Sequence, residues 1–193
     1  MSDAATPPPG NDHDHPEEVR WSGRFVVAKT RGKWEYVGRT RGIRAAVILA
    51  IHRGEVILVE QYRVPLGRRC LELPAGLIGD ETDGEAIEAA AIRELEEETG
   101  WRAGRVTLLG DFAASPGMLS ETFTLVRAEE LVRTGQGGGI DDEDILVHHV
   151  PLAEVAAFVE AKRGEGLAMD VKLLLLLAPA FVGPAFPGSA LLG

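Results

Sequence analysis

Acidic side chains are concentrated in one short stretch near the middle of the chain. Glu94, Glu97 and Glu98 lie between Arg93 and Gly100, in a segment whose Glu, Ala, Ile and Leu content favours a helix. Residues three and four apart share one face of a helix, so these carboxylates are expected to lie together. Because like charges repel one another, such a cluster favours a compensating cation. Hard oxygen ligands at this density suit Mg²⁺ or Mn²⁺.

An acidic run by itself is more often a solvated helical face than a site. Two features favour a site here. The run is fixed between Arg93 and Gly100, and Glu85 stands eight residues before Arg93, about two helical turns away. We therefore expect Arg93 to pair with Glu97 at i+4 and with Glu85 or a neighbouring acid, which would hold the carboxylates in place.

The whole segment around these carboxylates resembles the Nudix box, G-x5-E-x7-R-E-U-x-E-E-x-G-U, in which U is an apolar residue. The matching positions are Gly79, Glu85, Arg93, Glu94, Leu95, Glu97, Glu98 and Gly100. Trp101 occupies the last apolar position and is larger than the aliphatic residue usual there. Chance does not account for this many fixed positions at these spacings.

A second stretch resembles the branch of this family formed by ADP-ribose and related nucleotide-sugar pyrophosphatases. Gln61–Arg63 followed by Leu71–Gly76 is similar to the QYR…ELPAG segment of that branch, and Pro116 lies fifteen residues beyond Trp101, as it does there. In that branch the box glycine usually belongs to the Pro-Ala-Gly turn. Here the turn ends three residues before Gly79, so we expect a longer loop.

The resemblance implies metal ligands on the acidic helix and on the loop before it. Glu94 and Glu98 would be the main ligands of Mg²⁺ or Mn²⁺, with Glu97 beside them and the Ala75 carbonyl as a further ligand. The other box residues would hold the helix and the loop in place, and these are Gly79, Glu85, Arg93 and Gly100.

A second acidic cluster, residues 141–144, resembles a loop that carries a glutamate used as general base in some members of the branch. The alignment leaves Asp141 and Glu143 as candidates for this base, and Glu97 on the helix is a third. Gly135–Gly139 precedes the cluster and predicts a flexible loop, which suits closure over a substrate. The alternative is a solvated turn that leads into the next strand.

Four residues form the candidate substrate-binding set, namely Arg63, Glu72, Arg44 and Trp34. Three of them, Arg63, Glu72 and Trp34, have an alternative interpretation. Arg63 and Glu72 are equally well explained as a structural ion pair. An aromatic residue such as Trp34 is more often part of a core or a dimer interface than a platform for a base.

The activity implied by the resemblance is metal-dependent hydrolysis of the pyrophosphate bond of a nucleoside diphosphate derivative, with ADP-ribose giving AMP and ribose 5-phosphate. Other substrates of the same chemistry are GDP-mannose, another nucleotide sugar or a dinucleotide. Two other classes of function stay open, a nucleotide-binding module without hydrolysis and an acidic interaction surface. The branch often forms homodimers through its N-terminal strands, so a homodimer is expected by resemblance.

The elements that position these residues follow from hydrophobic patterning. Helices are predicted near residues 84–99, with Asp83 as N-cap, and near 152–162 and 169–178. Strands are predicted near residues 25–29, 33–39, 43–52, 55–63, 69–73, 106–113, 122–127 and 144–150. This order predicts an α/β (α+β) domain with a mixed sheet. The resemblance implies a Nudix-type α/β/α sandwich plus N-terminal antiparallel strands.

Bulk properties limit the partners and the compartment. A net charge of -10 and a pI near 5.0 argue against a nucleic-acid partner. Cys70 is the only cysteine, which fits a reducing compartment. The N-terminus does not resemble a signal peptide, and the apolar run 173–182 is too short to span a bilayer. We expect a cytoplasmic protein with no membrane partner.

Composition also predicts the domain boundaries. Residues 1–18 are rich in proline and acids and contain almost no large apolar side chain, so they predict a disordered tail. Residues 19–182 are expected to form one domain, and residues 183–193 a flexible C-terminal tail.

Overall fold

The computed structural model describes residues 11–40, 43–79, 85–140 and 143–177. Its backbone contacts divide the chain into two units. The N-terminal unit comprises residues 1–43 and 113–121, and the larger unit comprises residues 44–112 and 122–193. Among the residues that the structure describes, no helix is long and apolar enough to cross a membrane.

The N-terminal unit contains a three-stranded antiparallel sheet of β1 (Glu18–Ser22), β2 (Val26–Arg31) and β3 (Trp34–Arg39). Gly32 lies in the turn between β2 and β3 with a φ of +57°, a conformation that favours glycine. Antiparallel strands were expected here, but β1 was not predicted, because its apolar alternation is limited to Val19 and Trp21 and follows directly on the segment predicted as a tail. A short 3₁₀ helix, Asp12–Asp14, precedes β1.

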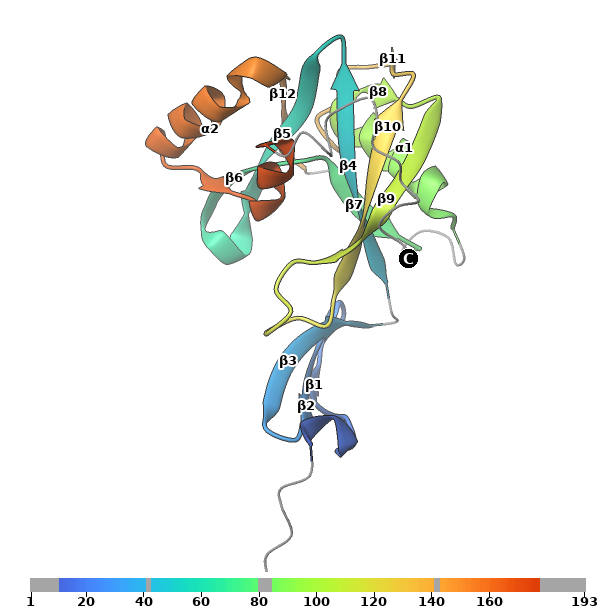
Figure 1. The fold of residues 1–193 in the computed structure, drawn as a ribbon, viewed down its shortest axis with the longest axis vertical. Helices are drawn as coiled ribbons and strands as arrows, with labels where there is room; N and C mark the ends of the chain where they lie inside the picture. The colour runs from blue at the N-terminus through green and yellow to red at the C-terminus, as the bar shows by residue number, and fades with distance from the viewer. Residues whose placement is uncertain (1–10, 41–42, 80–84, 141–142, 178–193) are drawn as a thin grey trace, which may run out of the picture. The chain divides into compact units, whose positions relative to one another are not determined.

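The larger unit is built on an eight-stranded sheet (Figure 1). Six strands follow the order β13-β6-β5-β4-β10-β9, while β12 pairs with β5 and β7 pairs with β4. The strands are β4 (Arg44–His52), β5 (Glu55–Arg63), β6 (Arg68–Glu72), β7 (Ala75–Ile78), β9 (Arg105–Ala113), β10 (Thr122–Glu129), β12 (Leu146–Pro151) and β13 (Ala168–Met169). Strand β4 runs parallel to β10 and antiparallel to β5 and β7, so the predicted mixed sheet is confirmed.

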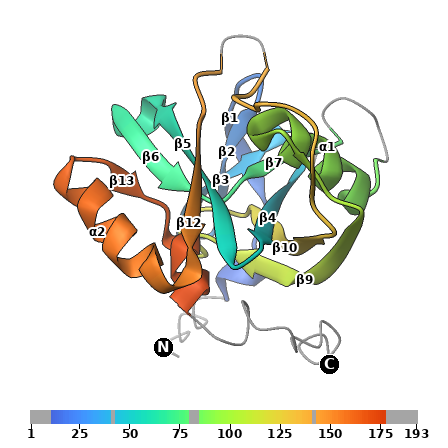
Figure 2. The same cartoon turned by 90° about the horizontal axis from the view of Figure 1, so that it is seen from above.

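Two helices lie on opposite sides of the central strands, α1 (Ile87–Thr99) and α2 (Val155–Gly164), as Figures 1 and 2 both show. Successive side chains of a strand point to opposite faces of its sheet. Ala46 and Ile48 of β4 therefore pack with Leu95 of α1, while Val47 of the same strand packs in the core that includes Val155 of α2. This arrangement confirms the predicted α/β/α sandwich.

Several elements differ from the predicted ones. Helix α1 begins at Ile87, without a side-chain cap bond from Ala86, and the predicted N-cap Asp83 lies outside the described residues. The segment predicted as a helix over 169–178 is a 3₁₀ helix, Val171–Leu177, in which Leu173 N donates to Asp170 O three residues back. Strand β13 immediately precedes Asp170 and leaves no room for an earlier helical turn.

Candidate active site

The carboxylate residues lie on the last two turns of α1. The buried side of this helix consists of small and apolar residues, among them Ala91 and Leu95, which pack on the sheet. The helix ends at Gly100, whose φ of +71° is left-handed and whose N–H donates to Glu96 O at 2.8 Å. Gly100, the second glycine of the box, therefore ends the helix.

Arg93 links the acidic residues of the helix to one another. Its guanidinium group lies 3.3 Å from a Glu85 oxygen, 3.0 Å from a Glu94 oxygen and 3.2 Å from a Glu97 oxygen. The expected pairs of Arg93 with Glu85 and with Glu97 are thus confirmed. The positive charge of Arg93 offsets the repulsion among these three carboxylates and fixes their positions along the helix.

Glu98 has a different environment, because its side chain is buried. It is 6% exposed, and its Oε2 accepts a hydrogen bond from Ala75 N at 3.1 Å. Burial raises the pKa of Glu98 to about 8, and the negative charges of Glu94 and Glu143 act in the same direction. A carboxyl group held in this way gains from a nearby cation, which favours its ionised form.

Strand β7 lies against the acidic side of α1 at Gly76. A Cβ atom added to Gly76 would lie 1.8 Å from Cδ of Glu94 and 2.1 Å from its Cγ. Any larger residue would therefore displace Glu94, so the glycine is required by close approach and not by its backbone angle. The Pro-Ala-Gly segment thereby brings both Glu94 and Glu98 to the edge of β7 that begins at Ala75.

The fit of these residues to a divalent cation rests on their donor chemistry. In the described part of the chain, no three His, Cys, Asp or Glu side chains converge as a ready-made metal cluster. Glu94 and Glu98 nevertheless supply hard oxygen donors beside Ala75 and Gly76, and one of the two carboxyl groups is buried without a countercharge bonded to it. This donor set fits Mg²⁺ or Mn²⁺. Glu97 lines a separate hollow of about 350 Å³ together with Arg93 and Arg102.

Arg63 and Glu72 form an ion pair between the neighbouring strands β5 and β6. Two parallel hydrogen bonds of 2.6 Å and 2.7 Å join them, and Glu72 is buried. The hydrogen bonds that Arg63 donates to Glu72 raise the pKa of Arg63, and the charge of Glu98 adds to this effect. The pair therefore lies within electrostatic reach of the carboxylate helix, and both its structural and its substrate-binding interpretation stay open.

The other two candidate substrate residues, Arg44 and Trp34, belong to different units of the chain. Arg44 on β4 donates to Asp111 Oδ1 at 3.1 Å and to Thr124 Oγ1 at 2.9 Å, on β9 and β10. Trp34 begins β3 in the N-terminal unit, where it is 49% exposed. Gly79, the first glycine of the box, has a φ of +81° at the end of the β7 segment.

The charge of Glu143, in the acidic loop, helps to raise the pKa of Glu98. Oε2 of Glu143 accepts a hydrogen bond from Ile140 N at 3.1 Å, so the side chain turns back over its own loop. Asp141, the other candidate base in this loop, lies outside the described residues. The structure thus brings Glu94 and Glu98 together at Ala75 and Gly76, and the charges of Glu143 and Arg63 act on Glu98.

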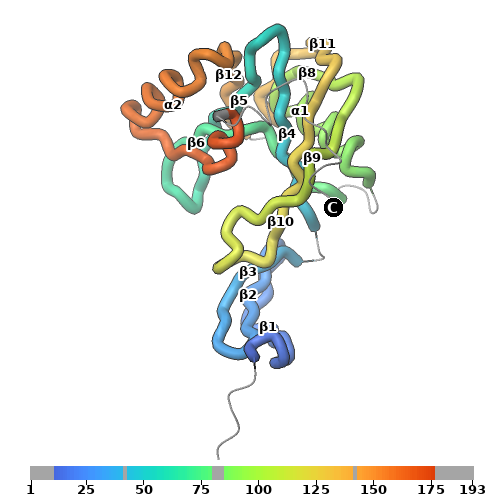
Figure 3. The backbone as a smooth tube through the Cα atoms, viewed as in Figure 1, coloured from blue at the N-terminus to red at the C-terminus, as the bar shows by residue number. Residues whose placement is uncertain are grey.

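The glycine run before this loop is bonded to the carboxylate helix and is not a free linker. Strand β11 (Val132–Arg133) pairs with β8 (Trp101–Arg102) beside the end of α1, as the tube in Figure 3 shows. From there, Gly138 N donates to Glu98 O and Gly139 N to Glu97 O. The expected flexible loop at Gly135–Gly139 is therefore wrong for this part, since its backbone groups satisfy the helix end.

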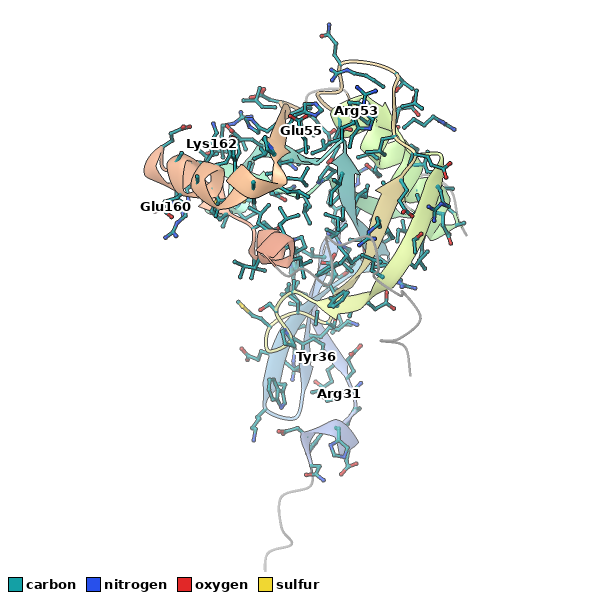
Figure 4. All side chains as sticks on the ribbon, turned by 45° about the horizontal axis from the view of Figure 1, so that its top comes forward. Arg31, Tyr36, Arg53, Glu55, Glu160 and Lys162 are labelled. Carbon is teal, nitrogen blue, oxygen red and sulfur yellow. The ribbon has the colours of Figure 1, made fainter. Side chains whose placement is uncertain are left out.

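A charge network around buried Glu60 holds the far end of the acidic loop and was not predicted from the sequence. Arg69 donates to Glu60 Oε1 at 2.8 Å and to Asp144 Oδ2 at 2.6 Å. His148 and Lys162, the latter labelled on α2 in Figure 4, contact the other oxygen of Glu60. Burial raises the pKa of Glu60, but these hydrogen bonds outweigh it and hold the pKa below its usual value. A glutamate in an apolar strand was the only signal for this network.

Comparisons with known proteins agree with the geometry. The family model described as NUDIX domain matches residues 40–168. The chain is 38% identical over 118 residues to the ADP-ribose pyrophosphatase of Bacillus subtilis (strain 168), covering 61% of this chain and 62% of that protein. It is 46% identical over 137 residues to the ADP-sugar pyrophosphatase of Mus musculus, covering 61% of each. The chain thus spans less than two thirds of the length of these two relatives.

A third relative is covered more fully. The chain is 36% identical over 151 residues to the GDP-mannose pyrophosphatase of Pectobacterium atrosepticum, which covers 74% of each protein. Among solved structures, one described as an ADP compounds hydrolase superposes with a TM-score of 0.67 and 24% identity, over 89% of this chain and 94% of that one. At that level of identity the match supports the fold alone.

Proposed function

The chain belongs to the Nudix family, and from this premise we propose that it hydrolyses the pyrophosphate bond of a nucleoside diphosphate derivative with the help of Mg²⁺ or Mn²⁺. The preferred substrate on this proposal is ADP-ribose, which would give AMP and ribose 5-phosphate. The single observation that carries the proposal is the placement of Glu94 and Glu98 about the Ala75–Gly76 edge of β7.

The charge of the substrate explains why these residues suit the reaction. A pyrophosphate diester carries two negative charges that slow the attack of water, and a divalent cation offsets this charge and favours ionisation of a nearby water. Glu94 and Glu98 would hold the cation, with the Ala75 carbonyl and Glu97 as further ligands. Arg93 keeps Glu94 and Glu97 in place, because it bonds to both.

The remaining protein group needed is a base for the attacking water. A water oxygen forms a bond to one phosphorus, the bridging P–O bond breaks, and one proton of the water passes to a carboxylate. Glu143 is the proposed acceptor, because its side chain rests on Gly139, which bonds to the end of α1, and its charge acts on Glu98. Asp141 and Glu97 are the alternatives, since Asp141 belongs to the same loop and Glu97 to the same helix.

The choice of ADP-ribose rests on the relatives and on the Arg63–Glu72 pair. Relatives named for ADP-ribose and ADP-sugars each match 61% of the chain. Arg63 retains exposed surface next to buried Glu72, so its guanidinium is available to a polar group of a substrate. Arg44 and Trp34 remain further candidates for substrate contact. GDP-mannose is the second candidate substrate, because the match to a relative named GDP-mannose pyrophosphatase covers 74% of that protein, more than the matches to the other two relatives.

Two further properties belong to the same proposal. We expect a homodimer formed through the N-terminal strands, and we expect the protein to act in the cytoplasm. A nucleotide-binding module without hydrolysis is the competing function, and the intact set of box carboxylates disfavours it.

A substrate panel tests the proposal. The wild-type protein would be incubated with ADP-ribose, GDP-mannose, a diadenosine polyphosphate, ATP and dGTP, each with Mg²⁺ and with EDTA, and the products separated by anion-exchange chromatography. We expect Mg²⁺-dependent cleavage, with the highest kcat/KM for ADP-ribose. A highest kcat/KM for GDP-mannose would select the second candidate. A highest value for ATP or dGTP would contradict the branch assignment, and binding without cleavage of any compound would favour the competing function.

A further inference from the structure

Three consecutive glycines, Gly137, Gly138 and Gly139, cross the C-terminal end of α1 just before the acidic loop; we call them the glycine clamp. Gly138 N donates to Glu98 O at 2.8 Å, and Gly139 N donates to Glu97 O at 3.1 Å. Carbonyl groups in the last turn of a helix have no partner within the helix. Here the partners come from the clamp, and the two carbonyls belong to acidic residues of the candidate site.

The contact between clamp and helix is closer than any side chain permits. A Cβ atom added to Gly137 would lie 2.3 Å from the carbonyl carbon of Thr99 and 2.7 Å from Glu98 O, both of them backbone atoms. The φ of Gly137 is +72°, which also disfavours any residue but glycine. A side chain at this position must lift the clamp from the helix.

The clamp leads directly to the candidate base. A Cβ atom on Gly139 would lie 2.6 Å from both Cβ and Oε2 of Glu143, so the Glu143 side chain rests on the glycine that bonds to Glu97. Ile145 N donates to Gly138 O at 3.3 Å and closes the loop on the clamp. The far end of the loop is held as well, because Arg69 bonds to the carboxylate and the carbonyl of Asp144.

We propose that the glycine clamp is a positioning element that sets Glu143 at a fixed place relative to Glu98 through the backbone of α1. This inference rests on the proposed hydrolase function. It differs from a simple helix cap, because a cap would contribute to stability without any selective effect on the proton-transfer step. It also differs from a flexible hinge, because the N–H groups of Gly138 and Gly139 are hydrogen-bonded to the end of α1.

The test compares two alanine variants from the same glycine run. Gly137→Ala introduces the clash with Thr99, whereas Gly135→Ala is the matched control, since a Cβ there has no atom within 4 Å and the backbone is not left-handed. Misplacing a catalytic group by about 1 Å can cost on the order of 100-fold in rate. We expect Gly137→Ala to lower kcat for ADP-ribose by about 10- to 100-fold, with KM within roughly threefold of wild type. Gly135→Ala should keep the wild-type kcat.

A double-mutant cycle with Glu143→Gln separates positioning from general damage. If the clamp acts through Glu143, Gly137→Ala should lower kcat little further once Glu143 has been replaced. Amide hydrogen exchange gives a readout that does not depend on activity. The amides of Gly138 and Gly139 should exchange at least about tenfold faster in Gly137→Ala than in Gly135→Ala, because their acceptors are lost.

Folding of each variant is checked by circular dichroism and thermal unfolding. If Gly137→Ala does not fold, Gly139→Ala takes its place in the cycle, because its Cβ would displace the Glu143 side chain directly. The inference is overturned if kcat is unchanged, if the losses multiply in the double variant, or if Glu143→Gln itself is fully active. If the wild type is active, any of these outcomes overturns the inference on the clamp and leaves the proposed hydrolase function intact. A wild type that cleaves no nucleoside diphosphate derivative overturns both the inference and the proposed function.

Discussion

At the scale of single residues, the acidic residues of α1 share one motif but have different environments. Glu94 and Glu97 both lie beside the guanidinium group of Arg93, at 3.0 Å and 3.2 Å. Glu98 is buried, accepts a hydrogen bond from Ala75 N and has a raised pKa. Spacing alone predicts a shared face, but burial and partners decide which carboxylate depends most on a bound cation.

Replacing either main ligand by its amide should remove most activity without disturbing the fold. Glu94→Gln and Glu98→Gln preserve size and remove one charged donor. We expect kcat for ADP-ribose at saturating Mg²⁺ to fall by more than the roughly 10- to 100-fold typical of losing an outer-shell partner. Glu88→Gln is the control, because Glu88 is exposed on the same helix. A wild-type kcat in both variants would contradict the proposed metal site.

The raised pKa of Glu98 predicts how stability depends on pH when no metal is present. The pKa is about 8 in the folded protein against 4.5 in an unfolded chain, so the folded state binds the extra proton between these values. The contribution to stability is fully present below about pH 4.5 and is lost as the pH rises to about 8. The expected total loss in free energy of unfolding is on the order of 5 kcal/mol.

Urea unfolding in EDTA at pH 5, 6.5 and 8 measures this dependence. Glu98→Gln has no carboxyl group to ionise there, so its free energy of unfolding should vary less with pH than that of the wild type. Adding Mg²⁺ should stabilise the wild type more at pH 8 than at pH 5, since the ion binds the ionised form. Equal pH dependence in both proteins would mean that Glu98 is not the responsible group.

At the scale of elements, the acidic loop determines which group acts as base. If Glu143 accepts the proton, Glu143→Gln should lower kcat by about 10²- to 10⁴-fold with little change in affinity for Mg²⁺, while Asp141→Asn should have a mild effect. Steady-state kinetics and a Mg²⁺ titration of each variant measure both quantities. The reverse order would move the role to Asp141. Near-normal kcat in the single and double variants would leave Glu97 as the base.

The main elements of the larger unit were predictable from the sequence because their apolar patterns are long. Strands β4 and β5 and helix α1 each contain enough apolar residues to mark them. Strands β8, β11 and β13 have two residues each, too few for any periodic pattern. Strand β7 was taken for a turn, since Ala75 and Gly76 have little strand preference and pairing with β4 decides their conformation.

The site itself was predictable only in part. The pairing of Arg93 with Glu85 and Glu97 follows from helical spacing, which is a local property. The bond from Ala75 N to Glu98 joins two elements and leaves no periodic trace in the sequence. Docking of Gly137 on Thr99 was missed for a different reason, because a glycine run fits both a flexible loop and a close backbone contact.

At the scale of the whole molecule, the N-terminal unit is the expected site of dimer formation. It exposes several large apolar side chains, namely Val19, Trp21, Phe25 and Trp34. Exposed apolar groups of this kind are typical of a protein interface. We expect a dimer by sedimentation velocity and a weaker dimer for Trp21→Glu. Val64→Glu, at an exposed position of the larger unit, is the control. A monomeric wild type at micromolar concentration would contradict the expectation.

The central claim is that the chain uses a divalent cation to hydrolyse a pyrophosphate bond. Its most direct test is the release of AMP from ADP-ribose by the wild-type protein as Mg²⁺ is titrated. The account predicts AMP and ribose 5-phosphate in equal amounts, a rate that rises to saturation with Mg²⁺, and no product in EDTA. A rate that does not depend on the cation, or no AMP at any Mg²⁺ concentration, would contradict it.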